Sequence, residues 1–383
     1  MLRPMPRAAI AAAGFTAMLN MYAPQPVLPM MSAEFGVGPA AISQIMTVNA
    51  LAVALMAPFT GVVADVLGRR TVIATAIALL VLPGVMMTFS SGLEMLLVWR
   101  FMQGLLLPPI FAVSVAYIGA EWKARDATAV TGTFIAATAV GGFSGRMVTA
   151  ALAETAGWRT AMLADAGITA FCALAVIALL PRERSFVHGT TLATSLRQML
   201  KHLRNPRLVA TFGVGFGIMF NFLSAFTYLG FRLVAPPFDL STTAVGAIFA
   251  TYLISIVTAP FTGALVSRFG RRNFGLLALS VWMAGILLTL APSLPVIVTG
   301  LFMITGAGFY VQVCCQSFVA THAREGNSSA VGLYVTSFYV GGSFGGLIPG
   351  LLWSSTGWPG VVSLIVAMLL IMAAFVRFAW RET

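Results

Sequence analysis

Apolar runs of about twenty residues follow one another along almost the whole chain, and short polar loops separate them. The runs lack the alternating pattern of barrel strands, so they predict membrane-spanning α-helices. The expected fold is an all-α membrane protein with a six-helix bundle in residues 1–180, a linker in 181–206 and a second, pseudo-symmetric six-helix bundle in 207–383. The twelve expected spans have approximate bounds 8–30, 42–64, 71–90, 94–119, 127–152, 159–180, 207–230, 242–265, 273–292, 295–320, 328–353 and 358–380.

The composition supports a membrane protein. Of the 383 residues, 59% are hydrophobic and only 9% are charged, whereas charged residues make up about 25% of an average soluble domain. The net charge of +11 resides in the short loops, which argues against a nucleic-acid partner. Cys172, Cys314 and Cys315 lie within apolar runs and form no metal-binding motif, so we expect no metal and no cofactor. The first apolar run is too long for a cleaved signal peptide.

Lysine and arginine are distributed unevenly between the two sides of the predicted bundle. If the N-terminus is cytoplasmic, eighteen of the 22 Lys and Arg residues fall in cytoplasmic segments, and only Arg159 and Arg232 fall outside. Short loops rich in these residues stay in the cytoplasm. We therefore expect a multi-pass protein of the cytoplasmic (inner) membrane, with both termini and the central linker on the cytoplasmic side.

Two copies of one stretch relate the halves of the chain. Residues 57–70 and 259–272 are identical at eight of fourteen positions, and both copies end in Gly-Arg-Arg. Repeats of this kind indicate a duplicated fold. Because each half has six spans, the copies run parallel. Transporters that are built from parallel repeats bind substrate between the halves near the middle of the membrane. A second repeat, in the fifth and eleventh spans, matches Gly132, Gly141, Gly142 and Gly145 with Gly332, Gly341, Gly342 and Gly345.

Three motifs resemble the major facilitator superfamily of secondary transporters, and the resemblance covers the whole chain. The signature after the second span is present as Gly61, Asp65, Gly68, Arg69 and Arg70. The fourth-span pattern of an arginine followed by Gln-Gly is present as Arg100, Gln103 and Gly104. The fifth span keeps the antiporter spacing of glycines, but Arg146 replaces the proline. With the proline-rich stretch 22–29, this variant looks most like the YnfM-type, drug:proton antiporter-like efflux permeases of the inner membrane.

The acidic residue of the first basic turn suggests a gate. The resemblance places Asp65 near the N-terminus of the eleventh span, around Ser328, when the cytoplasmic side is closed. A helix N-terminus stabilises a nearby carboxylate by roughly 0.3–1 kcal/mol. Arg69 could then link Asp65 to Glu121 or Asp126. The alternative is a basic turn that only fixes topology. The residues of the predicted latch are Gly61, Asp65, Gly68, Arg69, Arg70, Glu121 and Asp126.

Arg100 lies within the fourth predicted span, where a charge costs about 2.5–3.5 kcal/mol on insertion scales. Such a charge is tolerated where it faces a cavity or a partner. We expect Arg100 to bind substrate or to tune proton coupling, with Asn20 or Gln25 as its hydrogen-bond partner. The alternative is an arginine that only packs or extends toward the membrane surface.

Arg146 lies at a similar depth in the fifth span. The acids expected to meet it are Asp165 in the sixth span and Glu34 just beyond the first. One interpretation is a structural ion pair. The other is a protonation switch, in which the acid pairs with Arg146 in one state and is protonated in the other.

Polar side chains in the expected cavity-lining spans are further candidates for substrate contact. In lipid, such groups must face protein or water. The first span carries no acid, so the cavity is neutral to positive, which disfavours small organic cations and permits neutral or anionic amphiphiles. The candidates are Asn20, Tyr22, Gln25, Gln103, Asn221, Tyr228, Tyr310, Gln312 and Gln316.

Together these features predict a secondary active transporter that works by alternating access and is not an enzyme. The first hypothesis is proton-coupled efflux of small amphipathic or hydrophobic compounds. The alternative is proton-coupled or facilitative uptake of a small anionic or neutral metabolite, with Arg100 as the partner of an anion. A membrane-embedded enzyme is disfavoured because no span carries an HExxH motif or clustered acids. The expected partners are a small-molecule substrate, protons and the lipid bilayer, and we expect a monomer.

Overall fold

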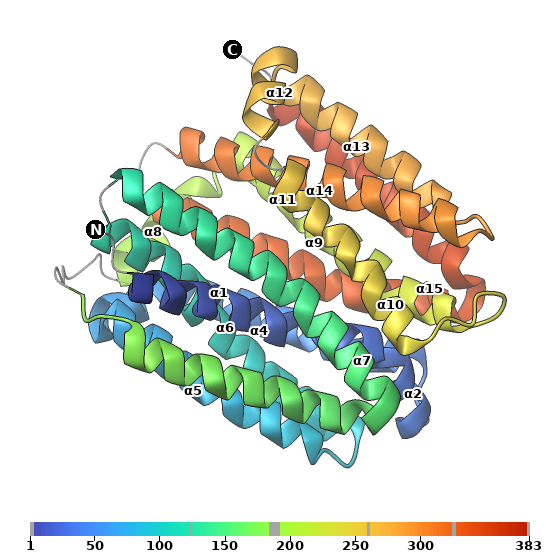
Figure 1. Cartoon of the computed structure of the whole chain (residues 1–383). Helices are drawn as coiled ribbons and strands as arrows, with labels where there is room; N and C mark the ends of the chain where they lie inside the picture. The colour runs from blue at the N-terminus through green and yellow to red at the C-terminus, as the bar shows by residue number, and fades with distance from the viewer. Residues whose placement is uncertain (1–3, 123, 184–191, 259–260, 324–326, 381–383) are drawn as a thin grey trace.

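The computed structural model describes residues 4–122, 124–183, 192–258, 261–323 and 327–380, and the regular elements among them are helices (Figure 1). Residues 184–191 of the linker and 259–260 of the second repeat copy lie outside the described residues. The first half contains α1 (Pro4–Tyr22), η1 (Gln25–Val27), α2 (Leu28–Phe35), α3 (Pro39–Ile42), α4 (Gln44–Leu67), α5 (Arg69–Thr88), α6 (Leu93–Glu121) and α7 (Ala124–Leu179).

Helix α8 (Leu192–His202) belongs to the linker, and the second half follows it. This half contains α9 (Pro206–Val234), α10 (Thr242–Ile248), η2 (Phe249–Leu253), α11 (Ile254–Thr258), α12 (Thr262–Phe269), α13 (Arg271–Leu288), α14 (Leu294–His322) and α15 (Asn327–Ala379).

These helices provide twelve membrane crossings. Seven helices among the described residues are long and apolar enough to cross a membrane, and the bent pair α10–α12 makes an eighth. Two of the seven, in α7 and α15, are broken by non-helical backbone at Gly157 and Gly357, so each supplies two crossings. Helices α1 and α13, of 19 and 18 residues, are not in that group and occupy the positions of the first and ninth expected spans.

The first expected span is interrupted. Helix α1 ends at Tyr22, and the chain continues through η1 into α2 rather than as one helix to residue 30. Pro24, Pro26 and Pro29 each lack the backbone N–H that a continuous helix would use. This break leaves Gln25 buried on the short η1 turn.

The eighth expected span is also irregular. It contains the 3-10 segment η2 between α10 and α11. A 3-10 segment changes the backbone hydrogen-bonding pattern of a helix. Here the Thr305 hydroxyl of α14 donates to the Thr251 carbonyl at 3.0 Å, which gives that carbonyl a partner. The segment presents the rings of Phe249 and Tyr252 on the same side of the span, toward Arg146.

The two halves repeat one close helix contact. In the first half α7 packs on α1, and in the second α15 packs on α9. At four positions a Cβ would collide with the backbone of the neighbouring helix, so the small size of glycine allows the approach. The glycines and the residues that they contact are Gly141 with Phe15, Gly145 with Leu19, Gly341 with Phe216 and Gly345 with Phe220.

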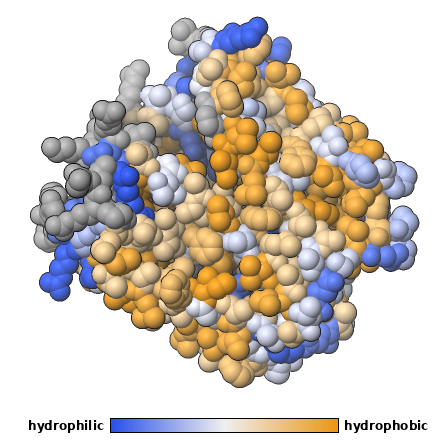
Figure 2. Space-filling view, viewed as in Figure 1, coloured by the Kyte–Doolittle hydropathy of each residue, from blue (hydrophilic) through white to orange (hydrophobic). Residues whose placement is uncertain are grey.

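The two ends of the bundle differ. The Arg69-Arg70 and Arg271-Arg272 turns, α8 and both marked termini lie at one end, at the upper left of Figure 1, which we call the basic end. The bends at Gly157 and Gly357 and the start of α10 lie at the opposite end, which we call the far end. Figure 2 shows a largely apolar surface between hydrophilic residues gathered toward the ends of the helices, as expected for a protein surrounded by lipid.

Candidate functional site

Polar contacts join the two halves at the far end. The Gln25 side chain of η1 donates to the Thr227 hydroxyl of α9 at 3.2 Å. The hydroxyls of Ser43 and Tyr228 lie 2.8 Å apart, and both donate to the Gly346 carbonyl of α15, at 3.0 and 2.7 Å. These contacts lie in the interior, because Gln25 and Ser43 are buried.

Close helix packing accompanies these hydrogen bonds. A Cβ on Gly346 would collide with Thr47 of α4, and a Cβ on Gly246 of α10 would come 2.5 Å from the Cβ of Ala150. At the exposed positions Gly61 and Gly132, toward the basic end, a Cβ would meet nothing within 4 Å. The contacts at Gly346 and Gly246 therefore make the far end a place of close packing between the halves.

Arg146 lies in this closely packed region, where both halves surround it. Its guanidinium carbon is 4.1 Å from the centre of the Tyr22 ring, 4.5 Å from that of Phe249 and 4.8 Å from that of Tyr252. Its Nε donates to Gln25 Oε1 at 2.9 Å, and its Nη1 donates to the Gly142 carbonyl at 3.0 Å. Its Nη2 is buried and has no hydrogen-bond partner among the described residues. Ring faces attract a cation, so the cage stabilises the buried charge.

No acid pairs with Arg146 in the described part of the chain, so the expected pairing with Asp165 or Glu34 is wrong. Glu34 instead forms an ion pair with Arg159 and accepts a hydrogen bond from the Trp158 indole. Burial disfavours the ionised form of Glu34, but the bonds from Arg159 and Trp158 outweigh it and hold the pKa of this carboxyl below its usual range. Arg159 also donates to the Ser90 carbonyl, so Glu34 belongs to a surface contact within the first half.

Arg100 is fully buried, and backbone carbonyls hold its guanidinium. It donates to the carbonyls of Asn20 at 2.9 Å, Met21 at 3.0 Å and Ile45 at 3.3 Å, and to the side-chain oxygen of Gln103. The expected bond to Asn20 is thus formed through the backbone of that residue, whereas Gln25 binds Arg146. These partners all belong to the first half, so Arg100 joins α1, α4 and α6 to one another.

A chain of hydrogen bonds leads from Arg100 across the first half. Gln103 donates to Asn20 Oδ1 at 2.9 Å, and Asn20 donates to the Thr169 hydroxyl at 2.8 Å. Thr169 in turn donates to the Asp165 backbone carbonyl at 2.7 Å. The polar residues of the first, fourth and sixth spans therefore form one connected network in the bundle interior.

Asp165 lies at the end of this network. Its side chain is buried, and its Oδ2 accepts from the Thr149 hydroxyl at 2.5 Å. Among the residues that the structure describes, its Oδ1 has no hydrogen-bond partner and no Arg or Lys forms an ion pair with it. Asp165, Asn20 and Gln103 line a small cavity with about 10 Å³ of space for the centre of a water molecule. That space is close to the minimum for one water.

The first basic turn has the geometry that its glycine predicts. Gly68 has φ 86°, and its counterpart Gly270 has φ 74°, values that favour glycine. Arg70 donates to the carbonyls of Leu180 at 2.6 Å and Ile177 at 2.9 Å, which ties the turn to the end of α7.

The latch itself stays a prediction. Arg69 lies 4.0 Å from Asp65, and its backbone N–H donates to Glu183 at 3.1 Å. Glu121 ends α6, and Asp126 lies in the first turn of α7. The side chain of Ser328, near the expected partner of Asp65, lies outside the described residues.

The remaining cavity candidates have different surroundings. Asn221 is buried; its amide donates to the Met372 sulfur at 3.5 Å, and its Oδ1 has no partner among the described residues. Tyr310 packs edge-on against Phe274 at 5.2 Å, within the second half. Gln312 is half-buried, and Gln316 is exposed.

The sequence did not predict that Gln25, Ser43 and Tyr228 contact residues of the other half. One signal was available, because Gln25 and Thr227 are separated by 202 positions, the offset between the two basic turns. Equivalent residues of two repeats meet where they lie near the symmetry axis. The described residues contain no group of three or more His, Cys, Asp or Glu that could hold a metal ion.

Comparison with known proteins agrees with this architecture. The family model of the Major Facilitator Superfamily matches residues 10–238 and again residues 214–383. The chain belongs to the major facilitator superfamily. Its apolar helices and its two matching halves are thus features of a membrane transport protein of this superfamily.

Several relatives are similar to this superfamily member along most of its length. The chain is 30% identical to the inner membrane transport protein YnfM of Escherichia coli, over 95% of this chain and 87% of YnfM. It is 29% identical to YybF, an uncharacterized MFS-type transporter of Bacillus subtilis, over 94% of this chain and 89% of YybF. A crystal structure of a mutant nucleoside transporter, NupG, has the same fold, with a TM-score of 0.79, 15% identity and coverage of 98% of this chain and 100% of that one.

Proposed function

We propose that this transporter exports small amphipathic or hydrophobic compounds across the cytoplasmic membrane by proton-coupled alternating access. The proposal assigns the basic end to the cytoplasm, because Lys and Arg gather in the loops there. With that orientation the far end faces outward. The close contacts between the halves would then lie on the outer side, which suits a transporter that takes up its substrate from the cytoplasm.

The surroundings of Asp165 carry the proposal of proton coupling. An ionised carboxylate that is buried without a cation is costly, because it loses its hydration. The Asp165 side chain accepts one hydrogen bond, and its other oxygen has no partner among the described residues. A proton on that oxygen would remove the charge and supply a donor toward the cavity shared with Asn20 and Gln103. The site therefore suits reversible binding of a proton.

The position of Asp165 also connects it to the far-end closure. Its partner Thr149 lies three residues after Arg146 on α7, so both lie on one face of that helix. Arg146 contacts Phe249 and Tyr252 of the second half. Movement of α7 on protonation would therefore reach the contact between the halves.

The glycines of the fifth span support export. Their spacing resembles that of antiporters, and Gly141 and Gly145 hold α7 tightly against α1. The neutral-to-positive interior, with the buried cations Arg100 and Arg146, suits neutral or anionic amphiphiles better than organic cations.

A second candidate function is uptake of a small anionic metabolite. Arg146 favours it, because its Nη2 is buried without a hydrogen-bond partner between the two halves. Arg100 favours it less, since its donors are directed to Gln103 and to backbone carbonyls. An anion at the interface would therefore meet Arg146 rather than Arg100.

Proton flux in proteoliposomes distinguishes these functions. Purified protein is reconstituted with a pH-sensitive dye inside the vesicles, and a panel of lipophilic and anionic compounds is added outside. Antiport exchanges the entering compound for a proton, so the interior becomes alkaline, whereas symport acidifies it and uniport leaves it unchanged. We expect lipophilic compounds to make the vesicle interior alkaline. If instead a single small anion acidifies it, the export proposal is wrong and the uptake function is supported.

A further inference from the structure

Helix α8 in the linker and the turn after it, residues 203–204, carry basic and apolar side chains on their outward side. Leu200 and Leu203 are 64% and 48% exposed, and the basic residues Arg197, Lys201 and Arg204 are exposed beside them. The basic residues are spaced by four and three positions, so they lie on one face. No Asp or Glu occurs in residues 192–204. The outward surface of α8 therefore pairs an apolar stripe with a positive one.

The opposite face of α8 packs on the protein. Ser329 of α15 donates to the Gln198 side chain at 3.1 Å, and a Cβ on Gly332 would lie 3.6 Å from the Met199 methyl group. His202, on the same face, is buried. These contacts fix the rotation of α8, so Leu200 and Leu203 are held outward.

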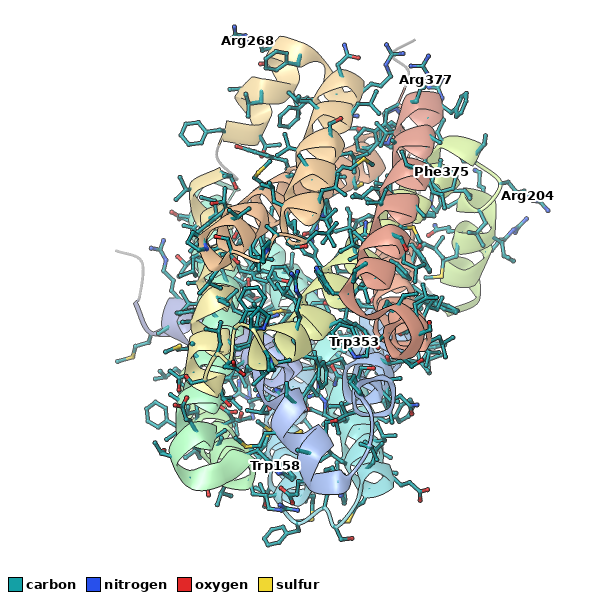
Figure 3. The ribbon with its side chains drawn as sticks, turned by 90° about the vertical axis from the view of Figure 1, so that its right-hand side faces the viewer. Trp158, Arg204, Arg268, Trp353, Phe375 and Arg377 are labelled. Atoms are coloured by element: carbon teal, nitrogen blue, oxygen red, sulfur yellow. The ribbon has the colours of Figure 1, made fainter. Side chains whose placement is uncertain are left out.

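Helix α8 lies at the periphery of the bundle. Seen from the right-hand side of Figure 1, Arg204 projects outward at the edge of the molecule (Figure 3). The linker belongs to the basic end, where the spans leave the membrane. An outward helix at that level meets the headgroup region of the surrounding bilayer.

We propose that α8 lies in the membrane interface and binds anionic phospholipid. Leu200 and Leu203 enter the acyl-chain region, and Arg197, Lys201 and Arg204 contact lipid phosphates. Amphipathic helices with this division of surfaces bind in the interface plane, and basic residues near the surface attract anionic lipid. In water both leucine side chains would stay exposed, which is unfavourable for apolar surface, whereas the acyl chains of the bilayer would bury them. This inference does not depend on the direction or substrate of transport.

Native mass spectrometry of the full chain in detergent tests the proposal. The protein is titrated with dioleoyl phosphatidylglycerol or with dioleoyl phosphatidylcholine, and the retained lipid is counted. We expect retention of the anionic lipid at lower concentrations than the zwitterionic one. Combining Arg197→Gln, Lys201→Gln and Arg204→Gln should weaken retention of phosphatidylglycerol about tenfold or more, because each basic residue contributes to its attraction.

A matched variant removes the same charge elsewhere. Arg182, Arg268 and Arg377 are also exposed, and their joint change to Gln should leave retention of phosphatidylglycerol near the wild-type value. Leu200→Asn with Leu203→Asn should weaken retention of both lipids while the charge is unchanged. The proposal is overturned if the α8 charge variant retains phosphatidylglycerol like the wild type, if the matched variant loses as much, or if the wild type shows no preference between the two lipids.

Discussion

The guanidinium of Arg146 lies 4.8 Å from the centre of the Tyr252 ring, although the two residues belong to different halves of the chain. The same guanidinium binds Gln25, which in turn donates to Thr227 in the second half. Arg146 therefore contacts the second half through aromatic rings rather than an acid, at the closely packed far end. Alternating access requires that this contact break when the far end opens.

Arg146→Gln should shift the protein toward a far-end-open state. The change removes the cation from its cage, and each cation–π contact is worth about 0.5–2 kcal/mol. A loss of about 1.4 kcal/mol changes the ratio of the two states tenfold. Distances between spin labels on the two halves at the far end would report the shift. An unchanged distance distribution would show that the cage does not hold the far end closed.

Arg100→Gln should destabilise the first half instead of shifting the states. The arginine donates to the carbonyls of Asn20, Met21 and Ile45, which the shorter side chain would leave unpaired in the interior. An unsatisfied buried group costs about 1–3 kcal/mol. Thermal unfolding in detergent should show a lower midpoint for this variant, while the spin-label distances stay as in the wild type. A wild-type midpoint would contradict the structural role.

Gly346→Ala should hinder closure of the far end. The added methyl group would collide with Thr47 across the contact between the halves. Overpacking of this kind costs typically about 1–3 kcal/mol. Gly167→Ala is the matched control, because a Cβ there meets nothing within 4 Å. Spin-label distances should lengthen at the far end for Gly346→Ala alone; equal behaviour of the two variants would refute tight packing at Gly346.

Glu34 should make the stability of the protein depend on pH. Its pKa is lowered in the folded protein, so its contribution is complete above the unfolded value of about 4.3 and disappears as pH falls through the folded value. Wild type should therefore unfold at a higher temperature than Glu34→Gln at pH 7. The difference should shrink below about pH 4. A difference that is the same at both pH values would mean that the Arg159 and Trp158 contacts do not act through the ionised carboxylate.

Much of the fold follows from the sequence because long apolar runs have few alternatives in lipid. The breaks within the spans were harder to predict. Pro24 and Pro26 signal the end of α1, whereas the 3-10 segment at Phe249 depends on tertiary contacts such as that of Thr305 with Thr251. Burial of Arg100 was foreseeable, whereas its backbone partners were not, since carbonyls carry no sequence signal.

The candidate site was predictable only in part for a similar reason. Asp165 and Arg146 could be chosen as buried charges, and an ion pair between them was the simplest expectation. The structure instead places Thr149 on Asp165 and aromatic rings on Arg146. Which neighbour a buried charge meets depends on helix rotation, and the uniform hydrophobicity of these spans does not specify that rotation.

The most direct test of the proposed coupling measures Asp165→Asn in proteoliposomes. Substrate exchange without a gradient should persist, while transport driven by a pH gradient and the accompanying proton flux should be lost, because the amide cannot bind and release the proton. Asp239→Asn, which changes an exposed acid, should keep both activities. Full gradient-driven transport by Asp165→Asn would contradict the account, and loss of exchange in a folded Asp165→Asn protein would assign Asp165 to substrate binding instead.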